Sequence, residues 1–82
     1  MSYEIKIERK ALKFINRQDR PQRVRLLAAI HRLPDEGDRK ALKGTPGVYR
    51  LRVGEYRVLY TVNNGQLIVT VIDAGNRGQI YK

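Results

Sequence analysis

The chain contains no cysteine, and its 82 residues include only one histidine and three prolines. Without cysteine, neither a disulfide framework nor a thiolate metal site can stabilise the fold, so stability has to come from packing. No segment approaches the roughly 20 apolar residues of a membrane span, and the N-terminus lacks the apolar core of a secretory signal. We therefore expect a single cytoplasmic domain, residues 1–82, with one modest core and no membrane-spanning segment.

Acidic residues are also scarce. Eight Asp and Glu stand against 17 Lys and Arg, which gives a formal net charge of +9 at neutral pH. A surface of this charge attracts polyanions through its field alone, so nucleic acid is the leading class of partner. An anionic membrane surface and an acidic protein are the alternatives, and composition does not separate the three.

The N-terminal half predicts one strand and two helices. Apolar residues alternate over 3–7, which indicates a short half-buried strand. From Glu8 the apolar spacing becomes helical for about nine residues, and it breaks at 16–19. Pro21 fits the first turn of a second helix, which ends before Pro34. The expected apolar side of this second helix is a stripe of Val24, Leu27, Ala28 and His31, with Leu26, Ile30 and Leu33 beside it.

The segment 35–44 is polar and predicts a solvated connection. Its acidic cluster at 35–38 lacks the length and the alternation of a calcium loop, so we predict no metal site there. Leu42 is expected to turn back into the core.

The C-terminal half predicts three strands, at 48–53, 56–62 and 66–74, with tight turns at Gly54-Glu55 and Asn64-Gly65. A two-residue turn at Asn64-Gly65 would pair Tyr60 with Val69, Val58 with Val71, and Arg57 with Ile72. With the N-terminal strand, these segments form an antiparallel-rich sheet of four strands. The expected fold is α+β, of order β-α-α-β-β-β, with the apolar sheet face packed on the helical hairpin.

The first of these hairpins places three arginines on one sheet face. Its turn puts Arg52 opposite Arg57, and Arg50 opposite Leu59. Like charges directly opposite each other destabilise a sheet, so we interpret the cluster as an anion site that lies in solvent. A merely solvated basic face is the alternative. The position on central strands, away from a protective edge, argues against it.

Most catalytic templates are missing from the sequence. It offers no cysteine nucleophile, no Walker-type loop and no paired carboxylates near the arginines, and we expect a structural role for His31. Arginine and tyrosine remain, and they suffice for internal cleavage of RNA, in which the ribose 2′-OH is the nucleophile. Arginines stabilise the charged phosphorane, and nearby cations favour a tyrosine phenolate as base. This chemistry requires no metal.

Four short motifs occur in a fixed order: RKALK at 9–13, LKGTPGVYR at 42–50, YRVLY at 56–60, and GNR at 75–77 followed by Tyr81. Together they resemble the RelE/ParE superfamily of bacterial toxins, and more specifically its RelE branch of ribosome-dependent messenger-RNA endonucleases. The resemblance implies the fold described above and a type II toxin that inhibits translation by cutting messenger RNA without a cofactor. It also implies the ribosome, messenger RNA and a small acidic antitoxin as partners, the last in a hetero-oligomer.

The resemblance implies roles for individual residues. Tyr81 would be the general base toward the 2′-OH, while Arg57 and Arg77 would bind the phosphate, with Arg77 near the leaving group. Arg50 and Arg52 would also bind RNA phosphate, and they stand where relatives commonly carry lysine. We expect ribosome contacts at three arginines on or beside the second helix, Arg20, Arg23 and Arg25. Two other functions stay open, namely ParE-like inhibition of DNA gyrase and non-catalytic RNA binding.

Overall fold

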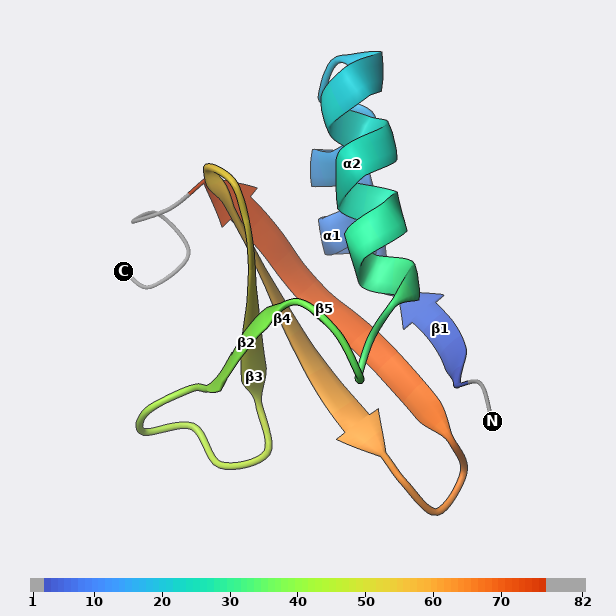
Figure 1. Ribbon diagram of the computed structural model, residues 1–82, viewed down its shortest axis with the longest axis vertical. Coiled ribbons are helices and arrows are strands. Elements are labelled where there is room, and N and C mark those ends of the chain that lie inside the picture. The colour runs from blue at the N-terminus through green and yellow to red at the C-terminus, as the bar shows by residue number, and fades with distance from the viewer. Residues whose placement is uncertain (1–2, 77–82) are drawn as a thin grey trace.

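The computed structural model describes residues 3–76, which form two helices and a five-stranded sheet (Figure 1). The elements are β1 (Glu4–Ile7), α1 (Arg9–Asn16), α2 (Arg20–His31), β2 (Asp38–Ala41), β3 (Tyr49–Val53), β4 (Tyr56–Asn63) and β5 (Ile68–Asn76). The strand order is β1-β5-β4-β3-β2, with β1 parallel to β5 and the other pairs antiparallel. The predicted α+β fold is confirmed, but the prediction of four strands is wrong.

The additional strand is β2, which lies at the sheet edge and pairs with β3. All four of its residues are exposed, and its sequence DRKA has no apolar alternation. Hydrophobic periodicity, the main sequence signal for a strand, is therefore absent. β2 forms because β3 offers it a free row of backbone hydrogen-bonding groups. The segment predicted as a solvated connection is thus partly sheet.

Both helices pack on the same face of the sheet, and their inward side chains join one core. Ala11 and Ile15 of α1 and Leu26 and Ile30 of α2 are fully buried. The sheet contributes Leu51, Val53, Val58, Tyr60, Val69 and Val71 to the same cluster. The predicted apolar sheet face is therefore confirmed. Within residues 3–76, neither helix has the length and apolar character to cross a membrane.

The most deeply buried residues of α2 are those predicted beside the main stripe, and of that stripe Leu27 packs against the core. Leu26, Ile30 and Leu33 are buried, whereas Val24 is 56% exposed. His31 is exposed on the helix surface, where its Nδ1 lies 2.8 Å from the carbonyl oxygen of Leu27. Apolar residues follow helical spacing on more than one side of α2, so the pattern alone did not identify the buried side.

The loop between β4 and β5 is longer than predicted. It comprises four residues, 64–67, rather than a two-residue turn. The Asn63 side chain supports the loop, because its Oδ1 accepts a hydrogen bond of 2.9 Å from the backbone N–H of Gln66. β5 is consequently shifted by two residues, and an even shift keeps the same side chains on the core face. Tyr60 pairs with Val71 and Val62 with Val69, in place of the predicted pair Tyr60–Val69.

A bulge in β5 changes the pairing again, close to the arginines. Leu59 pairs with Asp73 and Tyr60 with Val71, so Ile72 is the extra residue. A bulge reverses the alternation of the strand beyond it, which brings Ala74 to the core face. Beyond the bulge Val58 pairs with Ala74 and Arg57 with Gly75, where Val71 and Ile72 had been predicted. Arg57 therefore has a residue without a side chain as its neighbour on β5.

Candidate active site

The β3–β4 hairpin has the predicted register, which sets three arginines on one face. Arg52 pairs with Arg57, and Arg50 pairs with Leu59. Gly54 in the turn has φ +57°, and a Cβ at this position would overlap the guanidinium of Arg25 from α2. The positive φ thus favours glycine in the turn that aligns the arginines, and the exposed guanidinium of Arg25 lies beside this turn.

The three arginines differ in how far they reach solvent. Arg50 is only 9% exposed, and Leu59 opposite it is 8% exposed. Arg52 and Arg57 are half-buried. The prediction that the cluster lies in solvent is therefore wrong for Arg50. Because a buried guanidinium is unfavourable unless an opposite charge lies nearby, Arg50 needs a counter-ion.

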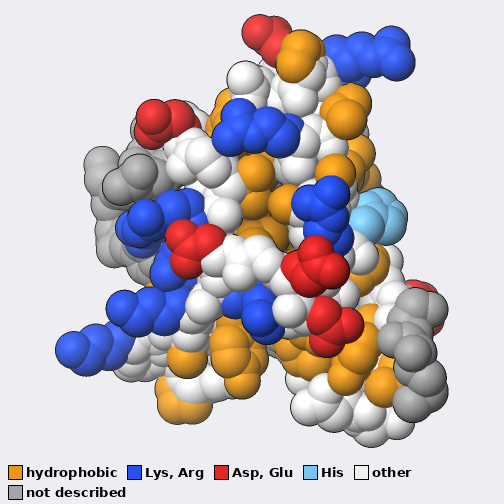
Figure 2. All heavy atoms as spheres, viewed as in Figure 1, with side chains coloured by type: hydrophobic (Ala, Val, Ile, Leu, Met, Phe, Trp, Pro, Cys, Tyr) orange, Lys and Arg blue, Asp and Glu red, His pale blue; other side chains and the backbone are white. Residues whose placement is uncertain are grey.

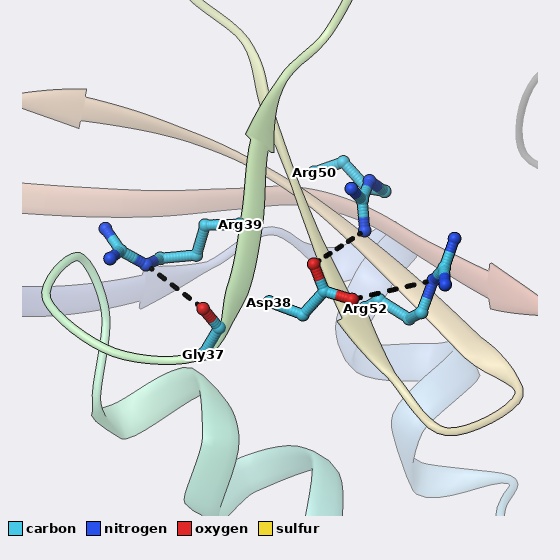
Figure 3. A network of polar contacts seen from close by, with 5 residues as sticks. All are labelled: Gly37, Asp38, Arg39, Arg50 and Arg52. Atoms are coloured by element: carbon cyan, nitrogen blue, oxygen red, sulfur yellow. Dashed lines mark hydrogen bonds and ion pairs between the residues drawn. The ribbon is translucent and has the colours of Figure 1, made fainter.

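Asp38 of β2 supplies this counter-charge (Figure 3). Its Oδ1 lies 3.6 Å from Nη1 of Arg50, and its Oδ2 lies 3.8 Å from Nε of Arg52. Both distances exceed the roughly 2.7–2.9 Å of a charge-assisted hydrogen bond. Within the described residues, these two buried nitrogens have no hydrogen-bond acceptor. Asp38 therefore contacts both arginines by electrostatic attraction without hydrogen bonds. Both guanidiniums keep hydrogen-bond donors that are available to an anion.

A cleft of about 250 Å³ opens beside this ion pair. It is lined by Lys40, Ala41, Leu42, Lys43, Arg50, Arg52 and Arg57. All of these residues except Ala41 and Leu42 are basic. Figure 2 shows several Lys and Arg side chains projecting on the side of the viewed face that carries β2. We call this site the arginine cleft, and its charge and size suit a phosphate group of a nucleic acid.

Three residues of this site were missed by the sequence analysis, namely Asp38, Lys40 and Lys43. All three lie in the segment interpreted as a solvated connection. Asp38 and Lys40 are two positions apart, which places them on one face once the segment is a strand. Charged residues are common on edge strands because they prevent aggregation. This tendency is the one sequence signal that favours an edge strand here.

A larger cavity, of about 360 Å³, is lined in part by side chains of β3 and β4 on the helical face of the sheet. Tyr49 and Tyr60 line it and stack on each other, with ring centroids 5.6 Å apart. Burial raises the pKa of Tyr60 above its ordinary value of 10.0, although the charge of Arg39 acts in the opposite direction. Burial of Tyr60 therefore disfavours its phenolate form. The smaller, basic cleft is therefore the candidate functional site.

The other predicted site residues lie apart from the cleft or outside the described part of the chain. Arg20 and Arg25 are exposed on α2, and Arg23 is partly buried. Nη1 of Arg23 donates a hydrogen bond of 3.1 Å to the carbonyl oxygen of Gln18. Since α2 packs on the opposite sheet face from the cleft, these arginines form a separate basic patch. Arg77 and Tyr81 lie outside the described residues.

Replacing Asp38 with asparagine is expected to lower the free energy of unfolding by on the order of 1–2 kcal/mol, because it leaves the buried charge of Arg50 without its counter-ion. The loss is smaller than for a fully buried pair because the Asp38 side chain is 56% exposed. Urea denaturation measures the change. Glu36→Gln removes the same charge from an exposed position nearby and should be nearly neutral, so equal losses in both variants would contradict the pairing.

Comparison with solved structures shows the same fold in several toxins. The chain is 28% identical to a chain of the archaeal RelE–RelB complex from Pyrococcus horikoshii OT3, with a TM-score of 0.77 and coverage of 96% of this chain and 99% of that chain. It is 26% identical to the isolated E. coli RelE toxin, with a TM-score of 0.72 and coverage of 98% and 92%. The RelBE2 complex from Mycobacterium tuberculosis shares the fold at 18% identity, with a TM-score of 0.80 and coverage of 94% and 100%.

Comparison with protein families gives a match over nearly the whole chain. No curated protein matches the sequence significantly. Residues 5–81 match the family model described as the ParE toxin of the type II toxin-antitoxin system parDE. Together with the RelE structures that share its fold, this match places the molecule among the toxins of toxin-antitoxin systems. The chain therefore belongs to the ParE toxin family, within the RelE/ParE superfamily.

Proposed function

We propose that the protein is a ribosome-dependent endoribonuclease that cuts messenger RNA and so inhibits translation in the cytoplasm. The observation that carries the proposal is the arginine cleft, in which Arg50, Arg52 and Arg57 share one face of the sheet. A gathering of guanidiniums stabilises a phosphorane more than a ground-state phosphate, because charge increases in the transition state. The similarity to E. coli RelE supports the RelE branch.

The reaction we propose is attack of a ribose 2′-OH on the adjacent phosphorus, without a metal. The 2′-oxygen forms a bond to phosphorus as its proton passes to the general base, and the bond from phosphorus to the 5′-oxygen breaks. The products are a 2′,3′-cyclic phosphate and a 5′-hydroxyl end. In this proposal Arg52 and Arg57 contact the phosphate, and Arg50 adds positive charge from a buried position. The proposed roles of Arg77 and Tyr81 are those implied by the resemblance.

We also propose that a small acidic antitoxin binds this protein in a hetero-oligomer. Structures similar to the chain include RelE–RelB complexes from Pyrococcus horikoshii, Methanococcus jannaschii and E. coli. A net charge of +9 favours an acidic partner. An acidic segment that reaches the arginine cleft would compete there with RNA phosphate.

A second candidate function is inhibition of DNA gyrase, which the match to the ParE family model favours. Binding to gyrase gives no evident reason for several cations to line one cleft. The arginine cleft therefore favours RNA cleavage over gyrase inhibition. A non-catalytic RNA-binding module would also use the charge of the cleft, but it would not cut RNA.

The three functions can be distinguished by incubating purified protein with translating ribosomes, with isolated messenger RNA and with DNA gyrase in parallel assays. We expect messenger RNA to be cut on ribosomes, little cleavage of isolated RNA, and unchanged gyrase supercoiling. Loss of supercoiling with intact messenger RNA would instead identify a gyrase inhibitor. Binding to RNA with no cleavage on ribosomes would identify a non-catalytic RNA-binding module.

Neutralising Arg20, Arg23 and Arg25 together is expected to weaken ribosome binding while leaving the cleavage rate at saturating ribosome unchanged, because the patch lies apart from the cleft. Each lost phosphate contact should make the slope of log affinity against log salt shallower by about 0.7–0.9. Binding titrations at several salt concentrations measure this slope. Loss of cutting at saturating ribosome would contradict the assignment of these arginines to binding.

A further inference from the structure

We propose that Lys40 is a catalytic residue of the arginine cleft and that its ammonium group donates a proton to the departing 5′-oxygen. The proposal rests on the endoribonuclease function proposed above and names a further group for that reaction. It concerns a residue of β2, the strand that hydrophobic periodicity does not reveal.

The register of β2 places Lys40 on the same sheet face as the arginines. Asp38 lies opposite Arg52 and Lys40 lies opposite Arg50. Directly opposite residues in an antiparallel pair project to the same face, with Cβ atoms about 4.5–5.5 Å apart. Lys40 is exposed and lines the cleft together with Arg50, Arg52 and Arg57. Lys40 is therefore accessible to RNA and is one of the residues that line the site that would hold the phosphate, although it also lines the larger cavity beside Tyr60.

The chemistry requires a group that can release a proton as the bond to the 5′-oxygen breaks. Guanidinium groups stabilise charge but do not release protons in proteins. Among the described residues that line the cleft, lysines are the only side chains with an ionisable proton to give, and they are Lys40 and Lys43. A lysine ammonium is a stronger acid than the alcohol that leaves, so the transfer is downhill once the bond has broken.

Position distinguishes Lys40 from Lys43. Lys40 lies within β2, whose backbone pairs with β3 and is thereby held beside Arg50. Lys43 follows the end of the strand, in the connection to β3. Proton transfer requires a donor within hydrogen-bond reach of the 5′-oxygen. Electrostatic attraction of RNA acts over longer distances and does not require such a fixed position. We therefore assign proton donation to Lys40 and electrostatic attraction of RNA to Lys43.

An N–H bond of the Lys40 ammonium breaks as the new O–H bond forms at the 5′-oxygen, and the electron pair of the broken bond to phosphorus remains on that oxygen. Lys40 is left as a neutral amine and regains a proton from water. The proton of the attacking 2′-OH goes separately to the general base.

The test compares two messenger RNAs on programmed ribosomes, using the full chain in single-turnover reactions. One carries the ordinary 5′-oxygen at the mapped cleavage position, and the other carries a bridging 5′-sulfur, which leaves without a proton. Lys40→Ala and Lys40→Arg should each cut the oxygen substrate about 10²- to 10⁴-fold more slowly than the wild type. Both should cut the sulfur substrate at nearly the wild-type rate. Lys40→Arg retains the positive charge, so its ribosome affinity should stay near normal.

Lys43→Ala is the matched control, since it removes a lysine from the same cleft. We expect weaker RNA affinity and the same relative rate on both substrates. Normal cutting of the oxygen substrate by Lys40→Arg, or equal slowing on both substrates in a folded Lys40 variant, would overturn the role of Lys40. Failure of the wild type to cut either substrate would overturn the endoribonuclease function, and the proton-donor role with it.

Discussion

Arg57→Ala is expected to slow messenger-RNA cleavage at saturating ribosome by about a hundredfold. Arg57 lies opposite Arg52 and next to Gly75, and its half-buried side chain lines the arginine cleft. Removing one preorganised group that stabilises developing charge typically costs about 3 kcal/mol of transition-state stabilisation. The contact strengthens as the phosphorane forms, so the rate should fall much more than the ribosome affinity.

Single-turnover cleavage and equilibrium binding to ribosomes separate the two effects. Arg57→Lys retains the charge but loses the planar bidentate donor, so its rate should lie between those of the wild type and Arg57→Ala. Lys6→Ala removes an exposed charge from β1 at the other edge of the sheet and serves as the control. If Arg57→Ala changed affinity alone and left the rate intact, Arg57 would have a purely positional role.

Tyr81→Phe is expected to lower cleavage by about 10² to 10⁴ while ribosome binding survives. The substitution keeps the aromatic ring and removes only the hydroxyl that we propose as general base. A tyrosine with an ordinary pKa of about 10 is a weak base at neutral pH, and the roles that the resemblance implies would set arginines near Tyr81 to stabilise its phenolate. The pH profile of single-turnover cleavage should therefore lose a limb that depends on the base.

Comparison with Tyr81→Ala distinguishes proton transfer from stacking on a nucleobase. A proton-transfer role predicts that both variants fail, whereas a stacking role predicts near-normal cutting by the phenylalanine variant and loss only in the alanine variant. Near-normal cleavage by Tyr81→Phe would end the assignment of Tyr81 as general base. Another group of the protein, or the ribosome, would then have to accept the 2′ proton.

Local patterns in the sequence were sufficient to predict the β3–β4 hairpin. Apolar and polar residues alternate on both sides of Gly54, and the turn permits one register with the apolar side chains on the core face. The pairs Arg52–Arg57 and Arg50–Leu59 follow directly, and the structure confirms them. The arrangement of the arginines was therefore predictable before any tertiary information.

Features that depend on tertiary contacts were not predictable in this way. β2 has no apolar periodicity, and it forms because β3 has a free edge. The bulge at Ile72 changes which residue faces Arg57, and no local pattern marks it. The burial of Arg50 depends on Asp38, a residue from a segment that looked like a solvated turn. Charge pairing between strands has no signature in hydrophobic spacing, so the acidic member of the site was missed.

The most direct test of the proposed function uses a messenger RNA with a single 2′-deoxynucleotide at the mapped cleavage position. On programmed ribosomes, we expect the all-ribose RNA to be cut, leaving a 2′,3′-cyclic phosphate and a 5′-hydroxyl end. The substituted RNA should stay intact at that position because its nucleophile is missing. Cleavage of the substituted RNA at the same bond would contradict the proposed attack by the 2′-OH, and intact all-ribose RNA would contradict the nuclease function.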